Sequence, residues 1–559
     1  MGQNNKSVFG FTIGPIYELM SSSRKTRELW FSSFFFSWYV KRLIELLSSI
    51  ENGSGTACFD FFIPLINSKT TQPQSKAGLF PDHIIGCSYK DKDETYNLIK
   101  SNIDKNNQFF ISLIDNLGKS SYLCGKSKTD VNNIFIDYIN TNFIVLPADK
   151  VNKNKIVEEV DNYLDGLERN RSFTLKRNID TCHRCKFLPS VFGIKDDFDK
   201  KRKSQHVCPF CFLKFKCHNS NEVSKETGQS INFRYPSTGE ISAWELIKNI
   251  NNNKLKKYLN DYDELFFEID TEAGRKFSQL LPKNIEIKPY HKYLAIVQVD
   301  GDNLGKTAKQ VDDPKILSQL LFDFGLKAKD ITVKYHGEPV YIGGDDILAF
   351  LPAAFKEDKE EDFKTVIDYV IELSEEYKST LKKGNISGSL SAGIHLFYYK
   401  HPLAMALKNA RRQLFDVAKK IPGKNSFSLL LTQHSGQCVN LQFKFDSDDL
   451  NEFNSLLKDF VSGKKAFPQG IHHKLGVYQR LITSINSRTQ LNYFFENRFN
   501  EEIHNKLTGL EEIKNILIRR LNNPYLSGAN LYTGEEALKI LNRFLSELRF
   551  IKFLVGESK

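Results

Sequence analysis

One pattern restricts the fold of this chain more than any other: residues 290–436 alternate strand-like and helical segments in the order β-α-β-β-α-β. The strand-like segments are rich in Val, Ile, Leu and Phe, and the helical ones repeat apolar residues every three or four positions. This order is typical of a ferredoxin-like sheet, in which the first strand pairs beside the central hairpin. We therefore expect an α+β domain whose first strand (292–305) lies next to a hairpin at 338–352.

The chain has 559 residues, too many for one hydrophobic core, so a multidomain protein is expected. A second strand–helix–strand pattern starts at residue 7 and indicates another α/β unit. A region dense in cysteine, lysine and phenylalanine follows, and the pattern after about residue 445 is helical. The expected domains are an α/β domain, a helical cysteine-bearing domain, a second α/β domain and a helical C-terminal domain, with bounds 1–150, 151–285, 286–440 and 441–559.

The composition favours a soluble globular protein, because 40% of the residues are hydrophobic and 26% are charged. The net charge of +11 favours nucleotides, nucleic acid or acidic proteins as partners. The most apolar stretch, residues 29–47, contains Lys41 and Arg42, so it predicts a buried amphipathic helix and no membrane span. The chain opens without a signal peptide and has nine cysteines, which together predict a reducing, cytoplasmic location.

The hairpin sequence "EPVYIGGDDILAFLP" (338–352) places Asp345 and Asp346 side by side at a turn, where their charges repel. A solvated turn would tolerate this, and the motif alone indicates nothing more. The first strand, however, ends in "VQVDGDNLGK", and its pairing beside the hairpin brings Asp300 and Asp302 near the same turn. Three or four carboxylates within a few ångströms do not all stay ionised without cations. Oxygen ligands of this kind select Mg²⁺ or Mn²⁺, which typically accompany a nucleoside triphosphate.

Two such ions could activate a 3′-hydroxyl and stabilise a pyrophosphate leaving group. The predicted catalytic residues are Asp300, Asp345 and Asp346. The predicted ligands of the two ions are Asp300, Gly301, Asp302, Asp345 and Asp346, and an indirect or solvent-facing role stays open for Asp302 and Asp346. Glycines at the turns would let phosphates approach the backbone. The predicted nucleotide-binding residues are Asn303, Gly305, Gly343, Gly344, Lys419 and Lys424, with Lys306 and Lys420 as further candidates for phosphate contacts.

Two CxxC motifs, "CHRC" (182–185) and "CPFC" (208–211), are separated by 22 residues. Four thiolates at this spacing form a tetrahedral Zn²⁺ site and leave no open position for a substrate, so a structural role is expected. The predicted zinc ligands are Cys182, Cys185, Cys208 and Cys211. Nearby alternatives, if one cysteine is not a ligand, are His183, His206, Cys217 and His218.

Several motifs together resemble a known family. "VDGDNLGK", "YIGGDDILAF" and "LSAGIHLFYYKHPLAMALKNARRQLFDVAKK" resemble the palm of the large subunit of type III CRISPR effector complexes, which is related to the GGDEF nucleotide cyclases. "FTIGPIYELMSSSRKTRELWFSSFFFSWYV" and "AGLFPDHIIG" (77–86) resemble the start of the Cmr-type (III-B) version. The resemblance implies two facing ferredoxin-like (cyclase/polymerase) palms, a zinc-binding domain between them and a helical C-terminal domain.

The resemblance also implies a function in antiviral defence, because the family's palm converts ATP into oligoadenylate second messengers when its complex binds target RNA. Carried to this chain, it makes Asp300, Asp345 and Asp346 the metal-binding set. The implied partners are sister subunits, a CRISPR guide RNA and a target RNA. The first palm has "FTIGP" where an aspartate would stand, so it is expected to bind or support rather than catalyse.

Many relatives begin with a nuclease domain that carries a His-Asp pair. No such dipeptide occurs here, so a form lacking that domain is expected, with signalling by the palm as its main output.

The leading hypothesis is a metal-dependent nucleotidyltransferase that makes an adenylate messenger from ATP. A second ATP as acceptor would give cyclic oligoadenylate, and another adenosine-bearing acceptor would give a different conjugate; the residues leave this open. The alternative is a non-catalytic, nucleotide-binding scaffold subunit of the same kind of complex. A freestanding GTP cyclase is disfavoured because no sensor domain is evident, and a templated polymerase because nothing resembles fingers and thumb.

Overall fold

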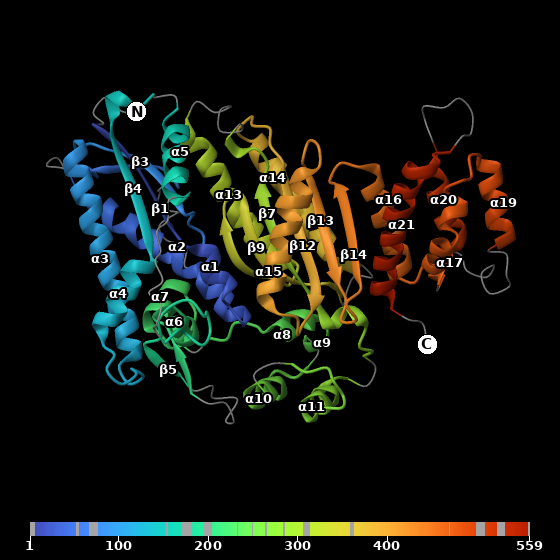
Figure 1. Ribbon diagram of the computed structural model, residues 1–559, viewed down its shortest axis with the longest axis horizontal. Helices are drawn as coiled ribbons and strands as arrows, with labels where there is room; N and C mark the ends of the chain where they lie inside the picture. The colour runs from blue at the N-terminus through green and yellow to red at the C-terminus, as the bar shows by residue number, and fades with distance from the viewer. Residues whose placement is uncertain are drawn as a thin grey trace.

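The computed structural model places two sheets side by side, with helices packed on each and a helical region beyond the second sheet (Figure 1). The residues that the structure describes are 6–51, 55–65, 77–152, 155–169, 180–194, 204–231, 233–248, 250–262, 265–282, 285–305, 313–357, 363–468, 470–498, 509–522 and 531–556. None of the described helices combines the length and the apolar character that a membrane span requires. Lys306, a predicted phosphate contact, lies outside the described residues.

The first sheet has four antiparallel strands in the order β2-β3-β1-β4. The strands are β1 Ser7–Gly14, β2 Phe59–Ile63, β3 His83–Ser88 and β4 Asn140–Pro147. The helices between them are α1 Ile16–Ser21, α2 Thr26–Ser48, α3 Lys92–Gly118 and α4 Lys128–Tyr138. This is a complete β-α-β-β-α-β unit with its first strand in the middle of the sheet. We call it the first palm.

Helices cover both faces of the first palm's sheet. Side chains alternate along β1, so neighbouring residues pack on opposite faces. Phe9 and Phe11 join the core shared with α2, whereas Val8 packs with the helix α5 (Ile156–Arg169). A side-chain carbon at Gly10 would lie 2.3 Å from Val160 of α5, so only glycine lets this helix approach. α5 therefore packs on the first palm, although the domain boundary expected at residue 150 precedes it; that boundary stays a prediction.

The second sheet has six strands in the order β14-β13-β12-β7-β9-β8, and only β12 and β13 run parallel. The strands are β7 Tyr293–Gly301, β8 Glu338–Gly343, β9 Asp346–Pro352, β12 Leu390–Tyr398, β13 Ser426–Thr432 and β14 Cys438–Lys444. Its helices are α13 Pro314–Lys334, α14 Val366–Lys382 and α15 Leu403–Arg412, which continues as a π-helical turn (Gln413–Val417) and a 3₁₀ turn (Ala418–Lys420). We call this unit the second palm.

The ferredoxin-like order predicted for the second palm is confirmed, because β7 lies between β12 and β9 and pairs beside the β8–β9 hairpin. The sequence did not predict the edge strand β14, whose alternately buried and exposed residues pack one face on the helical C-terminal region. That region contains α16 Asp448–Val461, α17 Ile471–Val477, α18 Gln479–Ile482, α19 Arg488–Arg498, α20 Gly509–Leu521 and α21 Gly534–Val555.

The apolar stretch 29–47 forms the buried helix α2, as predicted, and α2 also contacts β8 of the second palm. The two palms are joined at the same place by a backbone hydrogen bond of 2.9 Å from the Ile342 N–H to the Gly78 carbonyl. Lys315 of α13 pairs with Asp60 of β2 at 2.8 Å. The palms therefore share one hydrophobic core, with α2 lying between the sheets (Figure 1).

The cysteine-bearing unit lies beside the α1–α2 end of the first palm (Figure 1). It contains the antiparallel strands β5 Phe192–Ile194 and β6 Gln205–Val207 and the helices α6 Pro209–Lys216 and α7 Asn221–Thr227. Short helices lead from it to the second palm, namely α8 Thr238–Ser242, α9 Trp244–Ile247, α10 Asn252–Tyr262 and α11 Glu272–Leu280. A small ladder, β10 Ala354–Lys356 with β11 Phe363–Thr365, precedes α14.

Candidate active site and metal centre

Asp300 and Asp346 face each other across two strands of the second palm. The antiparallel register pairs Val299 of β7 with Ile347 of β9, which puts Asp300 opposite Asp346 one position further along. Opposite residues in such a ladder project from the same face of the sheet, with Cβ atoms about 4.5–5.5 Å apart. The next pair on this face, Gln298 and Leu348, lines a cavity together with Asp346. Two carboxylates therefore meet on the cavity side of the sheet.

Asp345 points to the other face. A side-chain carbon added to Gly301 would lie 2.4 Å from Asp345 Oδ2 and 2.9 Å from the Tyr377 hydroxyl, and the Cβ position of Gly301 is on the side away from Asp300. Gly344 makes the turn with a φ of +80°, which suits glycine. The structure thus brings Asp300 and Asp346 together but separates Asp345 from them. The catalytic role of Asp345 stays a prediction.

Burial makes the charges at the hairpin costly. It raises the pKa of Asp345 to about 6. Burial also raises the pKa of Asp346 to about 7, and the charges of Asp345 and Asp82 add to this shift while Arg411 opposes it. Carboxylates in such surroundings favour either a proton or a bound cation.

Asp302 is held by hydrogen bonds. Only 4% of the residue is exposed. One carboxylate oxygen accepts from the Ser391 hydroxyl at 2.8 Å, and the other accepts from the Ser389 hydroxyl at 2.8 Å and the Asn425 N–H at 2.9 Å. Because both oxygens already have donors, the arrangement favours the indirect role left open by the sequence, in which Asp302 ties the end of β7 to β12.

Two lysines reach the same strand end. Lys419, in the 3₁₀ turn after α15, forms an ion pair with Asp300 and donates to the Gly301 carbonyl at 2.9 Å. Lys424 donates to Asn303 Oδ1 at 2.7 Å. Lys419 therefore occupies the position where a cation would neutralise Asp300, and it provides the positive charge that a triphosphate would need there. Of the other phosphate candidates, Lys420 is exposed.

The predicted glycines lie around the hairpin and the end of β7. A side-chain carbon at Gly343 would lie 1.8 Å from the Tyr341 hydroxyl, so no larger residue fits. Gly305 has open space around its Cβ position.

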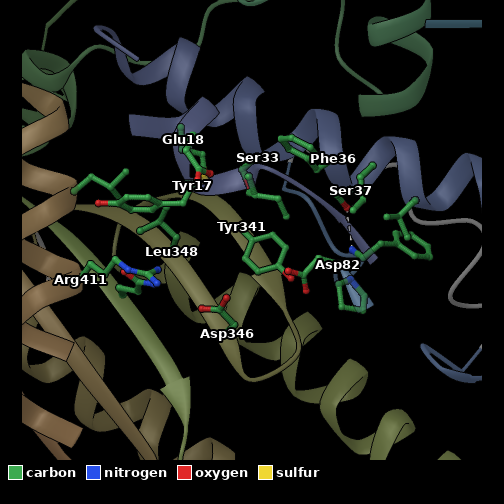
Figure 2. Close-up of a pocket in the computed structure, with 18 of the residues that line it drawn as sticks. Tyr17, Glu18, Ser33, Phe36, Ser37, Asp82, Tyr341, Asp346, Leu348 and Arg411 are labelled. Atoms are coloured by element: carbon green, nitrogen blue, oxygen red, sulfur yellow. Dashed lines mark hydrogen bonds between the residues drawn. The ribbon is translucent and has the colours of Figure 1, made fainter. Parts of the chain in front are cut away.

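A cavity of about 290 Å³ opens between the two palms. The first palm contributes residues of α1 and α2, including Tyr17, Glu18 and Ser37, and the second palm contributes Tyr341 and Asp346 (Figure 2). The carboxylates of this cavity therefore come from both palms. The sequence predicted only those of the second palm, because nothing local in the first palm indicates which residues will meet it.

Arg411 of α15 is a cavity residue that sequence reasoning missed. Its guanidinium lies 4.8 Å from the ring centre of Tyr17, across the gap between the palms (Figure 2). Arg411 and Lys419 belong to one segment, "ARRQLFDVAK", but a π-helical turn (Gln413–Val417) separates them. Helical spacing alone therefore does not show which cations of this segment face the cavity.

Asp82, His83 and Glu168 form an acidic group beside the cavity, with one ligand-type atom of each within 4.8 Å of the others. His83 is held by Asp161 at 2.7 Å and by Glu168 at 3.3 Å. Burial alone would lower the pKa of His83, but the hydrogen bonds to Asp161 and Glu168 raise it to about 10. The imidazolium therefore already balances part of this negative charge.

The four predicted zinc ligands come together. The sulfur atoms of Cys182, Cys185, Cys208 and Cys211 all lie within 4.8 Å of one another, and we call this group the four-cysteine cluster. Backbone N–H groups support it, with Arg184 donating to Cys182 Sγ at 3.4 Å and Cys211 donating to Cys208 Sγ at 3.3 Å. Four converging sulfurs in a largely buried site fit one tetrahedral metal ion.

The alternative ligands for this centre lie elsewhere. Cys217 donates instead to the Lys214 carbonyl, and His183 stacks on His206 with ring centres 5.1 Å apart. Neither they nor His218 belongs to the metal-binding groups found among the described residues.

Comparisons with known proteins agree with this architecture. Residues 293–428 match the family model for the second palm domain of Cas10/Cmr2, and residues 8–108 match that for the N-terminal domain of the CRISPR-associated protein Cmr2. Two segments of the chain are thus similar to Cas10/Cmr2 proteins.

A curated relative, the CRISPR system Cmr subunit Cmr2 of Pyrococcus furiosus, is 25% identical over 323 residues, which are 46% of this chain and 36% of the relative. The chain thus matches little more than a third of that protein's length. Two solved structures share the fold of this chain. The type III-B Cmr-beta structure in the apo state has a TM-score of 0.58, 11% identity and coverage of 98% of this chain and 81% of the other. The Cmr-beta structure bound to cognate target RNA has a TM-score of 0.59 and 12% identity, and the match covers 99% of this chain and 83% of the other.

Each of the two matched ranges contains residues that line the cavity. Asp346 and Arg411 lie within the Cas10/Cmr2 second-palm match, and Tyr17 and Asp82 lie within the Cmr2 N-terminal match. The four-cysteine cluster lies outside both matched ranges. The matched ranges therefore include residues from both walls of the candidate active site, whereas the metal centre rests on the geometry of this chain.

Proposed function

We propose that this chain is a Cas10/Cmr2-type nucleotidyltransferase subunit of a Cmr-type, RNA-guided antiviral complex, and that its second palm converts ATP into an adenylate second messenger. The observation that carries the proposal is the Asp300–Asp346 pair, which lies on the cavity side of the sheet with Lys419 against it. A carboxylate pair beside a lysine ammonium and an open cavity suits a metal-bound triphosphate.

Asp300 and Asp346 fit divalent cations because both present oxygen ligands from one face of the sheet. Two Mg²⁺ or Mn²⁺ ions, when bound, would neutralise phosphate charge and favour departure of pyrophosphate. Lys419, which forms an ion pair with Asp300, would supply a positive charge to a triphosphate bound there. Lys424 supplies a second positive charge at the same strand end.

The first palm provides the opposite wall of the cavity. Arg411 and Tyr17 form a cation–π contact across the gap, so a nucleotide in the cavity beside them would meet a positive charge and an aromatic side chain. The acceptor is either a second ATP, which gives cyclic oligoadenylate, or another adenosine-bearing molecule, which gives a different conjugate.

The proposed partners follow from the relatives. The curated relative is named a subunit of the Cmr system, and one structure of similar fold is described as bound to cognate target RNA. We propose that this chain assembles with sister Cmr subunits and a guide RNA, and that target RNA switches on the palm. A single structural Zn²⁺ is proposed for the four-cysteine cluster.

The test is to assemble the chain with its partner subunits and guide RNA, add labelled ATP and Mg²⁺, and determine product masses with and without complementary RNA. Other adenosine-bearing acceptors are added in parallel. A target-dependent adenylate product supports the proposal, and its mass identifies the acceptor. Bound ATP without release of pyrophosphate under any acceptor would instead establish the alternative, a nucleotide-binding scaffold.

A further inference from the structure

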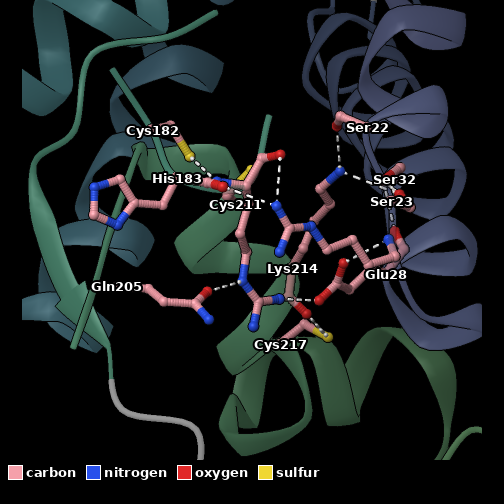
Figure 3. Close-up of polar contacts among 12 residues, drawn as sticks. Ser22, Ser23, Glu28, Ser32, Cys182, His183, Gln205, Cys211, Lys214 and Cys217 are labelled. Carbon is pink, nitrogen blue, oxygen red and sulfur yellow. Dashed lines mark hydrogen bonds and ion pairs between the residues drawn. The ribbon is translucent and has the colours of Figure 1, made fainter. Parts of the chain in front are cut away.

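The short helix α1 forms part of the cavity wall, and one buried lysine from the cysteine-bearing unit holds its C-terminal end. Tyr17 and Glu18 of α1 line the cavity. Lys214 lies on α6, three residues after Cys211, and is only 2% exposed. Its Nζ donates to the Leu19 carbonyl at 2.7 Å. It also donates to the hydroxyls of Ser22 and Ser23 at 2.9 and 3.2 Å (Figure 3). All three donors of the ammonium group are therefore used at the end of α1.

The other CxxC motif makes a second link to the same corner. Arg184, between Cys182 and Cys185, is 8% exposed and forms an ion pair with Glu28 of α2, which is 2% exposed. In the opposite direction, Arg24 of the α1–α2 turn donates to the His183 carbonyl at 2.8 Å. Each CxxC motif of the four-cysteine cluster therefore has one buried cation beside it that contacts the end of α1 or the start of α2.

We propose that the metal centre of the four-cysteine cluster fixes the α1 wall of the cavity through Lys214 and Arg184, and that Lys214 is a positioning residue for the nucleotide site. A shared metal ion holds the two CxxC loops at one distance, and with it the two buried cations. Without the ion the two loops are joined only by hydrogen bonds, such as that from the His183 N–H to the His206 carbonyl at 2.8 Å, and hold a less fixed distance. Lys214 then leaves its acceptors, because a buried ammonium is stable only while its hydrogen bonds are intact.

α1 depends on these contacts because it has only six residues. A helix this short is not stable in isolation, and its last carbonyls need donors from elsewhere. At Leu19 the Lys214 ammonium supplies the charged donor, beside the Ser22 hydroxyl at 2.7 Å, and Lys214 also holds Ser22 itself. When the ammonium is withdrawn, Tyr17 and Glu18 lose their fixed place in the cavity wall. The consequence for nucleotide affinity rests on the function proposed above, whereas the link between the metal centre and α1 does not.

The test measures backbone hydrogen exchange of the full chain loaded with Co²⁺, whose thiolate absorption reports that the four-cysteine cluster is intact. Lys214→Met is expected to raise exchange of the α1 amides at least tenfold with an unchanged Co²⁺ spectrum. Lys214→Arg, which keeps a cationic donor, is expected to restore most of the protection. Lys216→Met is the matched control, because Lys216 lies on the same helix but over the Phe215 ring, and its α1 exchange should equal that of the wild type.

The proposal would be overturned if the α1 amides of Lys214→Met exchanged at the wild-type rate while the Co²⁺ spectrum stayed intact. If that variant loses the metal, the wild-type chain is stripped with a zinc-selective chelator instead. Faster exchange in α1 with α21 unchanged then supports the link, and unchanged exchange in α1 overturns it.

A nucleotide readout separates this inference from the proposed function. In the assembled complex, Lys214→Met is expected to raise the KM for ATP about fivefold or more with kcat little changed, because α1 carries neither Asp300 nor Asp346. If the wild type binds no ATP but α1 still responds to Lys214→Met, the proposed function fails and the link stands. If the wild type turns over ATP and Lys214→Met changes neither exchange nor KM, the link fails and the function stands.

Discussion

Asp300 of β7 and Asp346 of β9 lie opposite each other in one antiparallel ladder and share the face of the sheet that borders the inter-palm cavity. Their meeting depends on register, because a shift of one residue in either strand would turn its carboxylate to the other face. The pairing of Val299 with Ile347 is therefore what creates the candidate metal site.

Replacing either member of this pair with asparagine is expected to abolish product formation. Asp300→Asn and Asp346→Asn should each lower kcat by roughly a hundredfold or more, the scale on which a preorganised electrostatic group contributes to catalysis. The assay follows labelled ATP in the assembled complex. Asp330→Asn, at an exposed position on α13, is the control and should retain full activity.

Asp345→Asn distinguishes the two aspartates of the hairpin. A loss equal to that of Asp346→Asn would show that Asp345 also serves the reaction, as the sequence predicts. Activity near the wild type would leave Asp345 with a structural role beside Tyr377. Loss of complex assembly in all three variants would contradict the proposed catalytic role and indicate a structural one.

Asp302→Ala is expected to lower the stability of the fold more than Asp346→Asn does. Its carboxylate accepts hydrogen bonds from Ser389, Ser391 and Asn425. Leaving buried donors without a charged acceptor costs on the order of 3 kcal/mol. Thermal unfolding should show a clearly lower Tm. Asp346→Asn should instead leave the Tm unchanged or slightly higher, because burial disfavours the charge it removes. Equal Tm values for both variants would contradict this assignment of roles.

Cys182→Ser is expected to lose the metal, whereas Cys217→Ser should keep it. Both cysteines are fully buried, but only Cys182 belongs to the cluster of four sulfurs. Metal content per chain, measured after exhaustive dialysis, should be about one Zn²⁺ in the wild type and in Cys217→Ser. Equal loss in both variants would mean that the fourth ligand has been misassigned.

The stabilisation by His83 is expected to depend on pH. Its pKa is raised from 6.5 to about 10 by Asp161 and Glu168, which outweigh the effect of burial. A group whose pKa is raised on folding contributes fully below the unfolded value and loses its contribution as pH rises through the folded value. His83→Gln should therefore lower the Tm most near pH 6 and progressively less toward pH 10.

His473→Gln serves as the control for this series, since His473 is exposed. Its Tm difference from the wild type should stay small throughout the range. A deficit in His83→Gln that is the same at both ends of the pH range would show that packing, and not the charge of the imidazolium, is what His83 contributes.

The sequence by itself determined the features that depend on local order and spacing. The alternation of strands and helices predicts the pairing of β7 beside the β8–β9 hairpin, and with it the nearness of Asp300 to the paired aspartates. The spacing of two CxxC motifs predicts the sulfur cluster. Both follow from order and spacing along the chain: a β-α-β-β order places its first strand beside the hairpin, and paired CxxC motifs at this spacing converge on one metal ion.

Only the tertiary structure decided which side chains face the cavity and which are already bonded. Asp302 meets two serines of β12 and the turn before it, and Asp345 turns toward Tyr377 of α14. Arg411 reaches Tyr17 of the other palm. These contacts join residues far apart in the chain, and they exist because two sheets pack around α2. Local propensity carries no information on that packing, since it results from the burial of apolar faces against one another.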